Sequence, residues 1–136
     1  MTRKLASAVF LVVGIVIGLG AYGHGFVGRL AIDAELDKFP IARDQYTMLY
    51  VVWYFLSGCM LLFGITVVGS WVRLRRGDRS LVGVSQLIGA LYLLSGVSGM
   101  IYRHGDPFMS LFIVLGALLL ASTWISTRGA PVTGAR

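Results

Sequence analysis

The chain alternates long uncharged stretches with short charged ones. Asp, Glu, Lys and Arg are absent from residues 5–28, 45–72, 80–102 and 107–127, which contain 24, 28, 23 and 21 residues. Because roughly 20 apolar residues cross the hydrocarbon core of a bilayer as a helix, each stretch is long enough to span a membrane. The pattern predicts an all-α integral membrane four-helix bundle that forms a single domain over residues 1–136. Its helices are expected at about 5–25, 45–72, 80–102 and 107–127.

The segment 28–44 is the longest expected connection outside the membrane. Ile32, Leu36 and Phe39 recur at spacings of four and three, as the apolar positions of an amphipathic helix do. We therefore expect a short interfacial helix here, ending before Pro40.

The first apolar stretch also resembles a secretory signal peptide, because it follows a basic start and ends in small residues. The run from Leu5 to Ala21 has 17 residues, however, whereas the core of a signal peptide has about 7–15. We expect a retained first helix.

The basic residues predict the orientation in the membrane. One end of the bundle would carry eight Lys and Arg residues and the other end four, so the positive-inside rule places both termini in the cytoplasm. The chain is therefore expected to form an antiparallel up-down bundle. We expect it to be a multi-pass protein of a bacterial inner membrane. The eight are Arg3, Lys4, Arg73, Arg75, Arg76, Arg79, Arg128 and Arg136; the four are Arg29, Lys38, Arg43 and Arg103.

Composition excludes several classes of protein. The chain is 57% hydrophobic and 13% charged, whereas a soluble domain is about 25% charged. The net charge of +6 is explained by the basic residues that set the membrane orientation and by attraction to anionic membrane lipid. No basic domain is present that would bind nucleic acid. No acid or base lies within the spans, which argues against a proton pump, a channel with charged rings or a secondary transporter. The single cysteine, Cys59, excludes an intramolecular disulfide.

Small residues recur along the spans and predict close helix packing. Gly14 and Gly18 are four apart, as are Ser95 and Gly99, and such pairs let helix backbones approach. Packing within the bundle is the first interpretation. The alternative is self-association, or contact with other membrane subunits, through these faces.

Both histidines occur in the frame Tyr-x-His-Gly, at residues 22–25 and 102–105. Each is expected at the outer end of an outward-running helix, at similar depth, so that the two would be neighbours. A histidine in the last turn of a helix interacts favourably with the helix dipole, and a following glycine can adopt the left-handed cap conformation. Simple helix capping by His24 and His104 is therefore one interpretation.

Three functional interpretations of the histidines stay open beside capping. His24 and His104 could ligate a haem iron axially, as a bis-histidine site. They could bind a metal with Asp33, Glu35 or Asp106, although no ligand-spacing motif supports such a site. They could act with Glu35 and Asp106 in acid–base catalysis on a lipophilic substrate. Neither a metal nor a cofactor is expected from the sequence itself.

An aromatic stripe is a candidate wall of a ligand-binding cavity. Tyr46, Tyr50 and Trp53 lie four and three residues apart, in line with Ser57, and Tyr54 extends an adjacent stripe. If this face points inward, it would line an outer-leaflet cavity for a flat lipophile such as a quinone, sterol or isoprenoid. The alternative is interfacial anchoring by an aromatic belt. Arg103 is expected to contact the same site and to pair with Asp33, Glu35 or Asp106, since an unpaired guanidinium near hydrocarbon is costly.

Several short motifs resemble the small bacterial four-helix membrane proteins of the DoxX-like group and neighbouring families of unknown function. These motifs are GLGAYGH, FPIARDQY, YVVWYFLSG and GVSGMIYRHGDPF, within roughly residues 10–125. His24, Trp53, Arg103 and Pro107 are the positions that could correspond. The resemblance implies a four-helix bundle and an accessory role near membrane redox or quinone chemistry.

The sequence thus favours an accessory or structural subunit of a larger membrane assembly. The alternatives are a small membrane enzyme that acts on a lipophilic substrate in an outer-leaflet cavity, and a bis-histidine haem protein.

Overall fold

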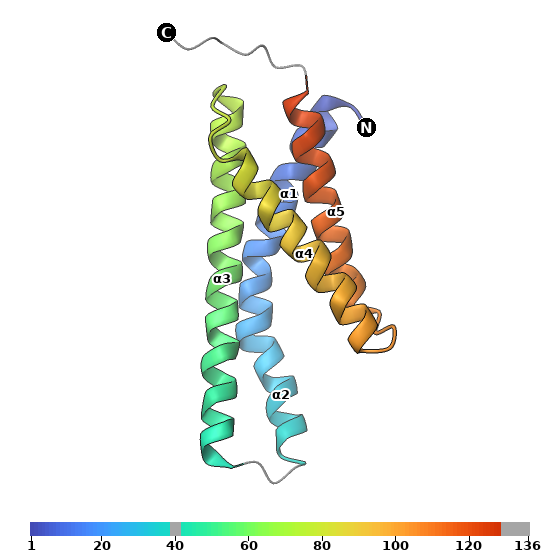
Figure 1. Cartoon of the computed structure of the whole chain (residues 1–136). Helices are drawn as coiled ribbons and strands as arrows, with labels where there is room; N and C mark the ends of the chain where they lie inside the picture. The colour runs from blue at the N-terminus through green and yellow to red at the C-terminus, as the bar shows by residue number, and fades with distance from the viewer. Residues whose placement is uncertain (39–41, 129–136) are drawn as a thin grey trace.

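The computed structural model describes residues 1–38 and 42–128, apart from the side chain of Glu35. All the elements of these residues are helical (Figure 1). They are α1 (Arg3–Tyr22), the π-helical turn η1 (Gly23–Val27), α2 (Gly28–Leu36), α3 (Arg43–Arg75), α4 (Val82–Tyr102) and α5 (Phe108–Thr127). The long helices run in alternate directions, and α1 begins at the end of the molecule where α5 finishes.

The first helix does not end at Gly25, which corrects the sequence-based boundary. η1 and α2 continue α1 with helical dihedrals, including φ −57° at Gly23 and φ −63° at Gly28, so helical backbone reaches Leu36. The short helix expected in the segment 28–44 exists, but as an extension of the first helix and not as a separate element. Phe39 and Pro40, which were expected at its end, lie outside the described residues.

Close contact with α3 explains the glycines that resembled a helix end. A methyl group on Gly25 would lie 3.2 Å from Ser57 Oγ, and one on Gly28 would lie 2.8 Å from the Trp53 ring. These glycines therefore allow α3 to approach and do not terminate the helix, although glycine is a poor helix former.

α1 and α3 form one tight pair. A methyl group on Gly64 of α3 would lie 2.5 Å from the backbone nitrogen of Gly18 and 2.9 Å from the carbonyl oxygen of Gly14. The expected packing of Gly14 and Gly18 within the bundle is confirmed, because small residues at a crossing bring helix backbones together.

α4 and α5 form the second tight pair. A methyl group on Gly116 would lie 2.6 Å from the carbonyl oxygen of Gly89, and one on Gly96 would lie 2.7 Å from the backbone nitrogen of Ile113. The Ser95 and Gly99 positions do not act as one face, since Ser95 is exposed whereas Gly99 lies against Met109.

The two pairs meet in an apolar core on the side where the chain begins. α1 contacts α5 more extensively than α3 contacts α4. α3 and α4 follow each other along the chain, but each packs more closely against its own pair partner than against the other. The buried core comprises Phe10, Val13, Ile17, Val67, Ile88, Tyr92 and Leu119.

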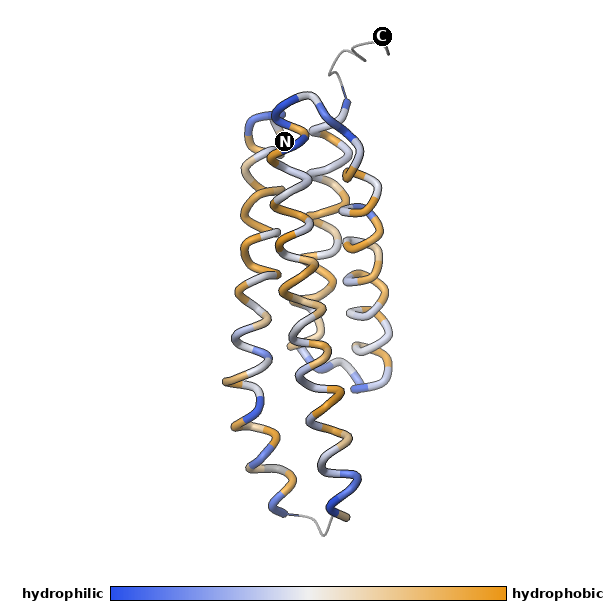
Figure 2. Tube along the Cα trace, turned by 90° about the vertical axis from the view of Figure 1, so that its left-hand side faces the viewer, coloured by the Kyte–Doolittle hydropathy of each residue, from blue (hydrophilic) through white to orange (hydrophobic). Residues whose placement is uncertain are grey.

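Within the part of the chain that the structure describes, four helical segments are long and apolar enough to cross a membrane: Arg3–Ala34, Arg43–Arg75, Val82–Tyr102 and Phe108–Thr127. Hydrophilic residues gather towards the two ends of the molecule and hydrophobic ones between them (Figure 2). The α1–η1–α2 and α3 pair extends beyond the turn that joins α4 to α5. α3 has 33 residues and α4 has 21, so at 1.5 Å per residue α3 is about 18 Å longer.

Candidate functional site: a cavity between the helix pairs

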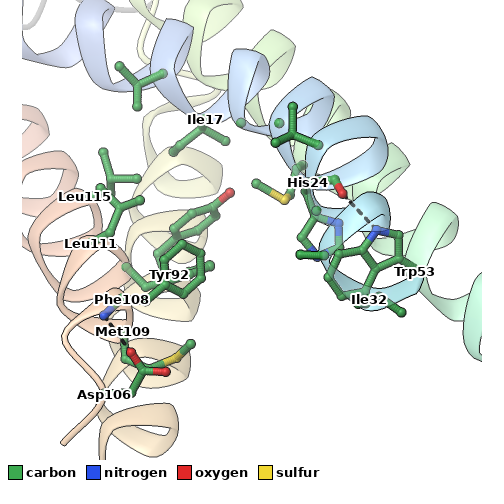
Figure 3. Close-up of a pocket in the computed structure, with 18 of the residues that line it drawn as sticks. Ile17, His24, Ile32, Trp53, Tyr92, Asp106, Phe108, Met109, Leu111 and Leu115 are labelled. Atoms are coloured by element: carbon green, nitrogen blue, oxygen red, sulfur yellow. Dashed lines mark hydrogen bonds between the residues drawn. The ribbon is translucent and has the colours of Figure 1, made fainter. Parts of the chain in front are cut away.

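A cavity of about 830 Å³ separates the two helix pairs towards the α4–α5 turn. It lies between the second half of α1 with η1 and α2 on one side, and α4 with α5 on the other (Figure 3). The cavity exists because each pair is held together at its own glycine crossings, while the two pairs diverge between the shared core and the α4–α5 turn. Its volume is within the range of about 300–1,000 Å³ that small-molecule sites occupy.

Most residues that line the cavity are apolar, and the few polar ones come from four different elements. The apolar side chains include Val16, Ile17, Val27, Ile32, Met60, Phe108, Met109, Leu111, Phe112 and Leu115. The polar or titratable ones are His24, Trp53, Tyr92, Arg103 and Asp106.

Tyr92 lines the cavity and carries a buried hydroxyl. Its side chain is 5% exposed, its ring stacks on that of Phe112 at 5.7 Å, and its hydroxyl has no hydrogen-bond partner within the described residues. Figure 3 shows the ring projecting from α4 towards the opposite helix pair. An unpaired buried hydroxyl costs about 1–3 kcal/mol, so this atom is a candidate for ligand recognition.

His24 stands on the opposite wall and is held in one orientation. Its ring stacks on Trp53 with centroids 3.8 Å apart, and its Nδ1 lies 2.9 Å from Ser57 Oγ. The Trp53 indole donates a hydrogen bond of 2.8 Å to the His24 carbonyl oxygen. The π-helical turn places His24 here, and such turns are frequent at functional sites.

One neutral tautomer of His24 satisfies both contacts of Ser57. With the Ser57 hydroxyl donating to the Trp53 carbonyl oxygen, at 3.0 Å, Nδ1 of His24 can donate to Ser57 Oγ at 2.9 Å. In this tautomer Nε2 carries no proton. Nε2 has no hydrogen bond within the described residues, so His24 can accept one from a ligand or act as a base.

Arg103 and Asp106 form the polar rim of the cavity in the α4–α5 turn. Arg103 Nε lies 2.6 Å from Asp106 Oδ2, which confirms the expected pairing of Arg103 with a carboxylate. The Phe108 backbone N–H donates to Asp106 Oδ1 at 2.9 Å. This N–H, together with Arg103, holds the pKa of the Asp106 carboxyl below its usual value.

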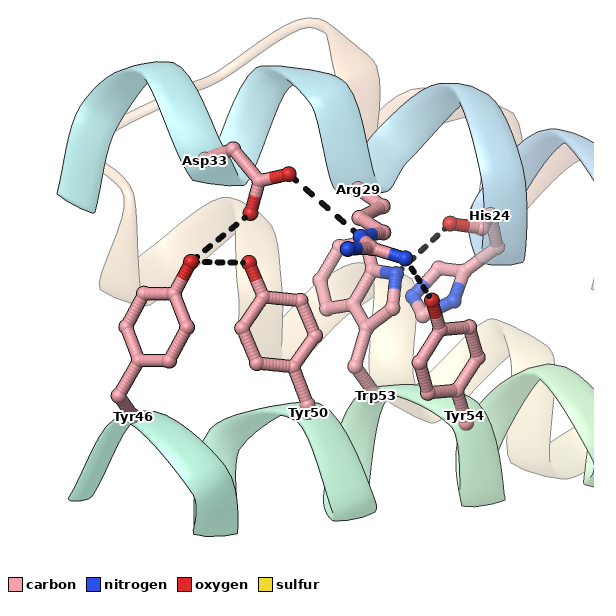
Figure 4. Close-up of polar contacts among 7 residues, drawn as sticks. All are labelled: His24, Arg29, Asp33, Tyr46, Tyr50, Trp53 and Tyr54. Carbon is pink, nitrogen blue, oxygen red and sulfur yellow. Dashed lines mark hydrogen bonds and ion pairs between the residues drawn. The ribbon is translucent and has the colours of Figure 1, made fainter. Parts of the chain in front are cut away.

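Three of the four aromatic residues expected to bind a ligand lie outside the cavity. The Tyr50 hydroxyl donates to Tyr46 at 2.9 Å, Tyr46 donates to Asp33 at 3.3 Å, and Arg29 donates to Tyr54 at 2.9 Å (Figure 4). Arg29 also pairs with Asp33 at 3.5 Å. The three tyrosines thus join α3 to α2, and of the stripe only Trp53 lines the cavity.

The structure places the two histidines in different environments. His104 is exposed, has a φ of +50° and does not line the cavity. The expectation that both histidines share one site at two equivalent helix ends is therefore wrong: His24 lies inside a continuous helix and His104 lies in a turn. The bis-histidine haem interpretation requires both rings at one iron, and of the two histidines only His24 lines the cavity.

Helix capping, in contrast, correctly describes the second frame. The N–H of Gly105 bonds to the carbonyl oxygen of Met100 at 2.9 Å and that of His104 to the carbonyl oxygen of Ile101 at 3.3 Å. This is the Schellman pattern, in which His104 occupies the left-handed position that glycine normally takes.

The remaining acids expected in the site have other partners where the structure describes them. Asp33 is engaged by Arg29 and Tyr46, Asp106 is paired with Arg103, and the Glu35 side chain lies outside the described part of the structure. Among the described residues no three His, Cys, Asp or Glu side chains are grouped as metal ligands.

Sequence reasoning missed Tyr92, although a signal for it was present. Tyr92 is ten residues from Val82 and ten from Tyr102, which places a hydroxyl about 15 Å from either end of a membrane-length helix. Aromatic belts explain tyrosines near helix ends, but they do not explain one at the centre.

Comparison of the chain with protein-family models, with curated proteins and with solved structures finds no match in any of the three. The resemblance to DoxX-like proteins stays a prediction from short motifs.

Proposed function

We propose that the protein is a multi-pass membrane protein that binds a lipophilic molecule between its two helix pairs, as an accessory subunit of a larger membrane assembly. The observation that carries the proposal is the cavity of about 830 Å³, with its apolar walls and few, separated polar groups. Sites for small lipophilic molecules combine such walls with a small number of polar atoms that fix orientation.

The proposed orientation puts the mouth of the cavity at the outer membrane surface. Both termini would be cytoplasmic, because the end that carries Arg73, Arg75 and Arg76 is the more basic one. Arg103 and Asp106 would then lie at the outer interface, while Tyr92 would lie near the middle of the bilayer. A lipophile could enter from the membrane and keep a polar group near the rim.

The cavity can be tested with a pair of substitutions on α2. Ala31 lines the cavity, whereas Ala34, on the same helix, does not. We expect native mass spectrometry of the delipidated wild-type protein to show a retained lipophile. Ala31→Trp should reduce its occupancy at least fivefold because the indole fills the site, and Ala34→Trp should retain it. Equal retention by both variants would refute binding in the cavity.

The subunit role is supported by the part of the molecule that extends past the α4–α5 turn. We call α2 and residues 43–54 of α3 the arm. Its two helices carry exposed apolar side chains, among them Leu30 at 70% and Met48 at 64% exposure. The uncharged stretch 45–72 is about 42 Å long as a helix, which exceeds the roughly 30 Å hydrocarbon core. Apolar arm residues would therefore project out of the bilayer, where a partner protein can cover them.

Site-specific photocrosslinking in cells tests the arm. A photoreactive amino acid at Met48 should give one discrete higher-mass product, whereas the same group at Leu94, equally exposed on α4, should give mainly lipid adducts. The subunit proposal fails if Met48 gives no product or if Leu94 gives the same one.

Acid–base catalysis in the same cavity is the second candidate, and one observation favours it. Nε2 of His24 has no hydrogen bond within the described residues, and it carries no proton in the tautomer in which Nδ1 donates to Ser57. Of the other residues expected to be catalytic, Asp106 lines the cavity and His104 does not. Turnover of a bound lipophile by the wild type, lost in His24→Gln while binding persists, would favour the enzyme.

A further inference from the structure

The Tyr92 hydroxyl is the one cavity group of α4 that has no role in the fold. Its oxygen is buried without a hydrogen-bond partner among the described residues, and its ring already packs on Phe112. A phenylalanine would keep that packing and remove the unpaired hydroxyl. The hydroxyl therefore lowers the stability of the ligand-free protein.

Water is a poor partner for this hydroxyl. A buried water is held by two to four polar groups, whereas Tyr92 belongs to an apolar cluster with Ile17, against which Phe112 and Leu115 pack. A lipophile with one oxygen suits these surroundings better, because the apolar walls accept its body and the hydroxyl satisfies its oxygen.

The charges around the cavity favour a neutral ligand. Arg103 and Asp106 neutralise each other at the rim, with 2.6 Å between them. Tyr92 is eleven residues before Arg103, or about 16 Å along a helix, so among the described cavity residues no Asp, Glu, Lys or Arg lies near it to compensate an ionised group. Across the cavity, the stacked rings of His24 and Trp53 offer a flat wall.

We propose that the cavity selects a neutral, flat lipophile whose carbonyl or hydroxyl oxygen accepts a hydrogen bond from the Tyr92 hydroxyl. This inference rests on the proposed function, since it names the class of ligand for the same cavity. Tyr92 is the residue that distinguishes an oxygen-bearing lipophile from a hydrocarbon of the same shape.

The test uses the full chain in lipid nanodiscs and the apolar photoprobe 3-trifluoromethyl-3-phenyldiazirine, which carries no oxygen. Labelling of Phe108, Met109 and Phe112 is measured by mass spectrometry while 9-fluorenone or fluorene competes. These competitors have the same ring system and differ in one carbonyl oxygen. In the wild type, fluorenone should compete about tenfold better than fluorene, which corresponds to one hydrogen bond in apolar surroundings.

Tyr92→Phe should reduce this preference to twofold or less. Tyr102→Phe is the matched control, because Tyr102 is on the same helix, 84% exposed and outside the cavity, and it should retain the tenfold preference. Partitioning of the competitors into lipid is common to all three proteins and cancels in the comparison. The thermal midpoint of ligand-free Tyr92→Phe should equal or exceed that of the wild type, which also shows that the variant folds.

The outcomes separate the inference from the proposed function. If the three cavity residues are not labelled, or if neither competitor displaces the probe, ligand binding in the cavity is refuted together with the inference. If both competitors displace it equally in the wild type, or if Tyr92→Phe keeps the preference, only the role of Tyr92 is refuted.

Discussion

His104 occupies a backbone position at which another turn of the same chain uses glycine. At the end of α3, Gly77 has a φ of +89°, and its N–H bonds to the Leu74 carbonyl oxygen at 3.1 Å. His104 takes the equivalent place after α4, at a φ of +50°. A left-handed residue other than glycine costs about 1–2 kcal/mol, so His104 is less stable in this conformation than glycine would be.

His104→Gly should therefore stabilise the protein by roughly 1 kcal/mol, because the relief of strain exceeds the entropy lost by glycine. Gly77→Ala should destabilise it by a similar amount for the opposite reason. Thermal unfolding in detergent would measure both changes. A lower midpoint for His104→Gly would mean that the exposed imidazole makes a stabilising contact that outweighs its backbone strain.

Asp106 makes stability depend on pH in a defined direction. Its pKa is lowered in the folded protein by the Phe108 N–H and by Arg103. The Asp106 carboxylate thus contributes stability to the fold above the unfolded pKa of about 3.9. This contribution is lost as pH falls through the lower folded pKa. Asp106→Asn should be less stable than the wild type at pH 6, and the difference in midpoint should shrink below about pH 4. A constant difference from pH 6 to pH 2.5 would contradict this assignment.

At the scale of the helices, the pattern of uncharged stretches predicted both ends of two helices closely and missed the end of the first helix. Helices expected at 80–102 and 107–127 are found at Val82–Tyr102 and Phe108–Thr127, because charged turns end them locally. The helix end expected at Gly25 is absent. It was expected because Gly23, His24 and Gly25 are residue types typical of a helix cap. What decides the structure there is contact with Ser57 and Trp53, some thirty residues away, which local sequence cannot reveal.

The same limit applies to the site. The Arg103 pair was predictable because its partner is three residues away and an isolated charge near lipid is costly. The tyrosine stripe was recognised, but its partner, α2, was expected to be a separate interfacial helix. Tyr46 consequently contacts Asp33 of that helix, and Tyr50 contacts Tyr46, instead of a ligand.

The glycine crossing between α1 and α3 gives a prediction for this element pair. Gly64→Ala should destabilise the protein by about 1–3 kcal/mol, because the added methyl group meets the backbone of Gly18 and Gly14 and not a movable side chain. Gly58→Ala, on the same helix and with open space around it, is the control and should change stability little. Resistance to unfolding in a graded series of denaturing detergent would report both. Similar midpoints for the two variants would show that the crossing tolerates separation of the helices.

For the molecule as a whole, the unequal lengths of the two helix pairs relate the cavity to the membrane. The α4–α5 pair matches a hydrocarbon core of roughly 30 Å, whereas the first pair extends past it. The rim formed by Arg103 and Asp106 therefore marks the level at which one bilayer surface should lie. In the proposed orientation the arm would stand beyond that surface, and the Arg-rich turn after α3 would lie at the other.

Cysteine accessibility tests this arrangement directly. In a Cys59→Ala background, a single cysteine is placed at Lys38 beside the arm or at Arg75 at the opposite end of α3. With both termini cytoplasmic, a membrane-impermeant maleimide added to intact cells should label Lys38→Cys but leave Arg75→Cys unlabelled until the membrane is permeabilised. The expectation follows from the excess of basic residues beside Arg75, which resist translocation. Labelling of Arg75→Cys alone in intact cells would invert the orientation and place the mouth of the cavity at the cytoplasmic surface. A lipophile would then exchange with the inner leaflet, although the Tyr92 site itself would be unchanged.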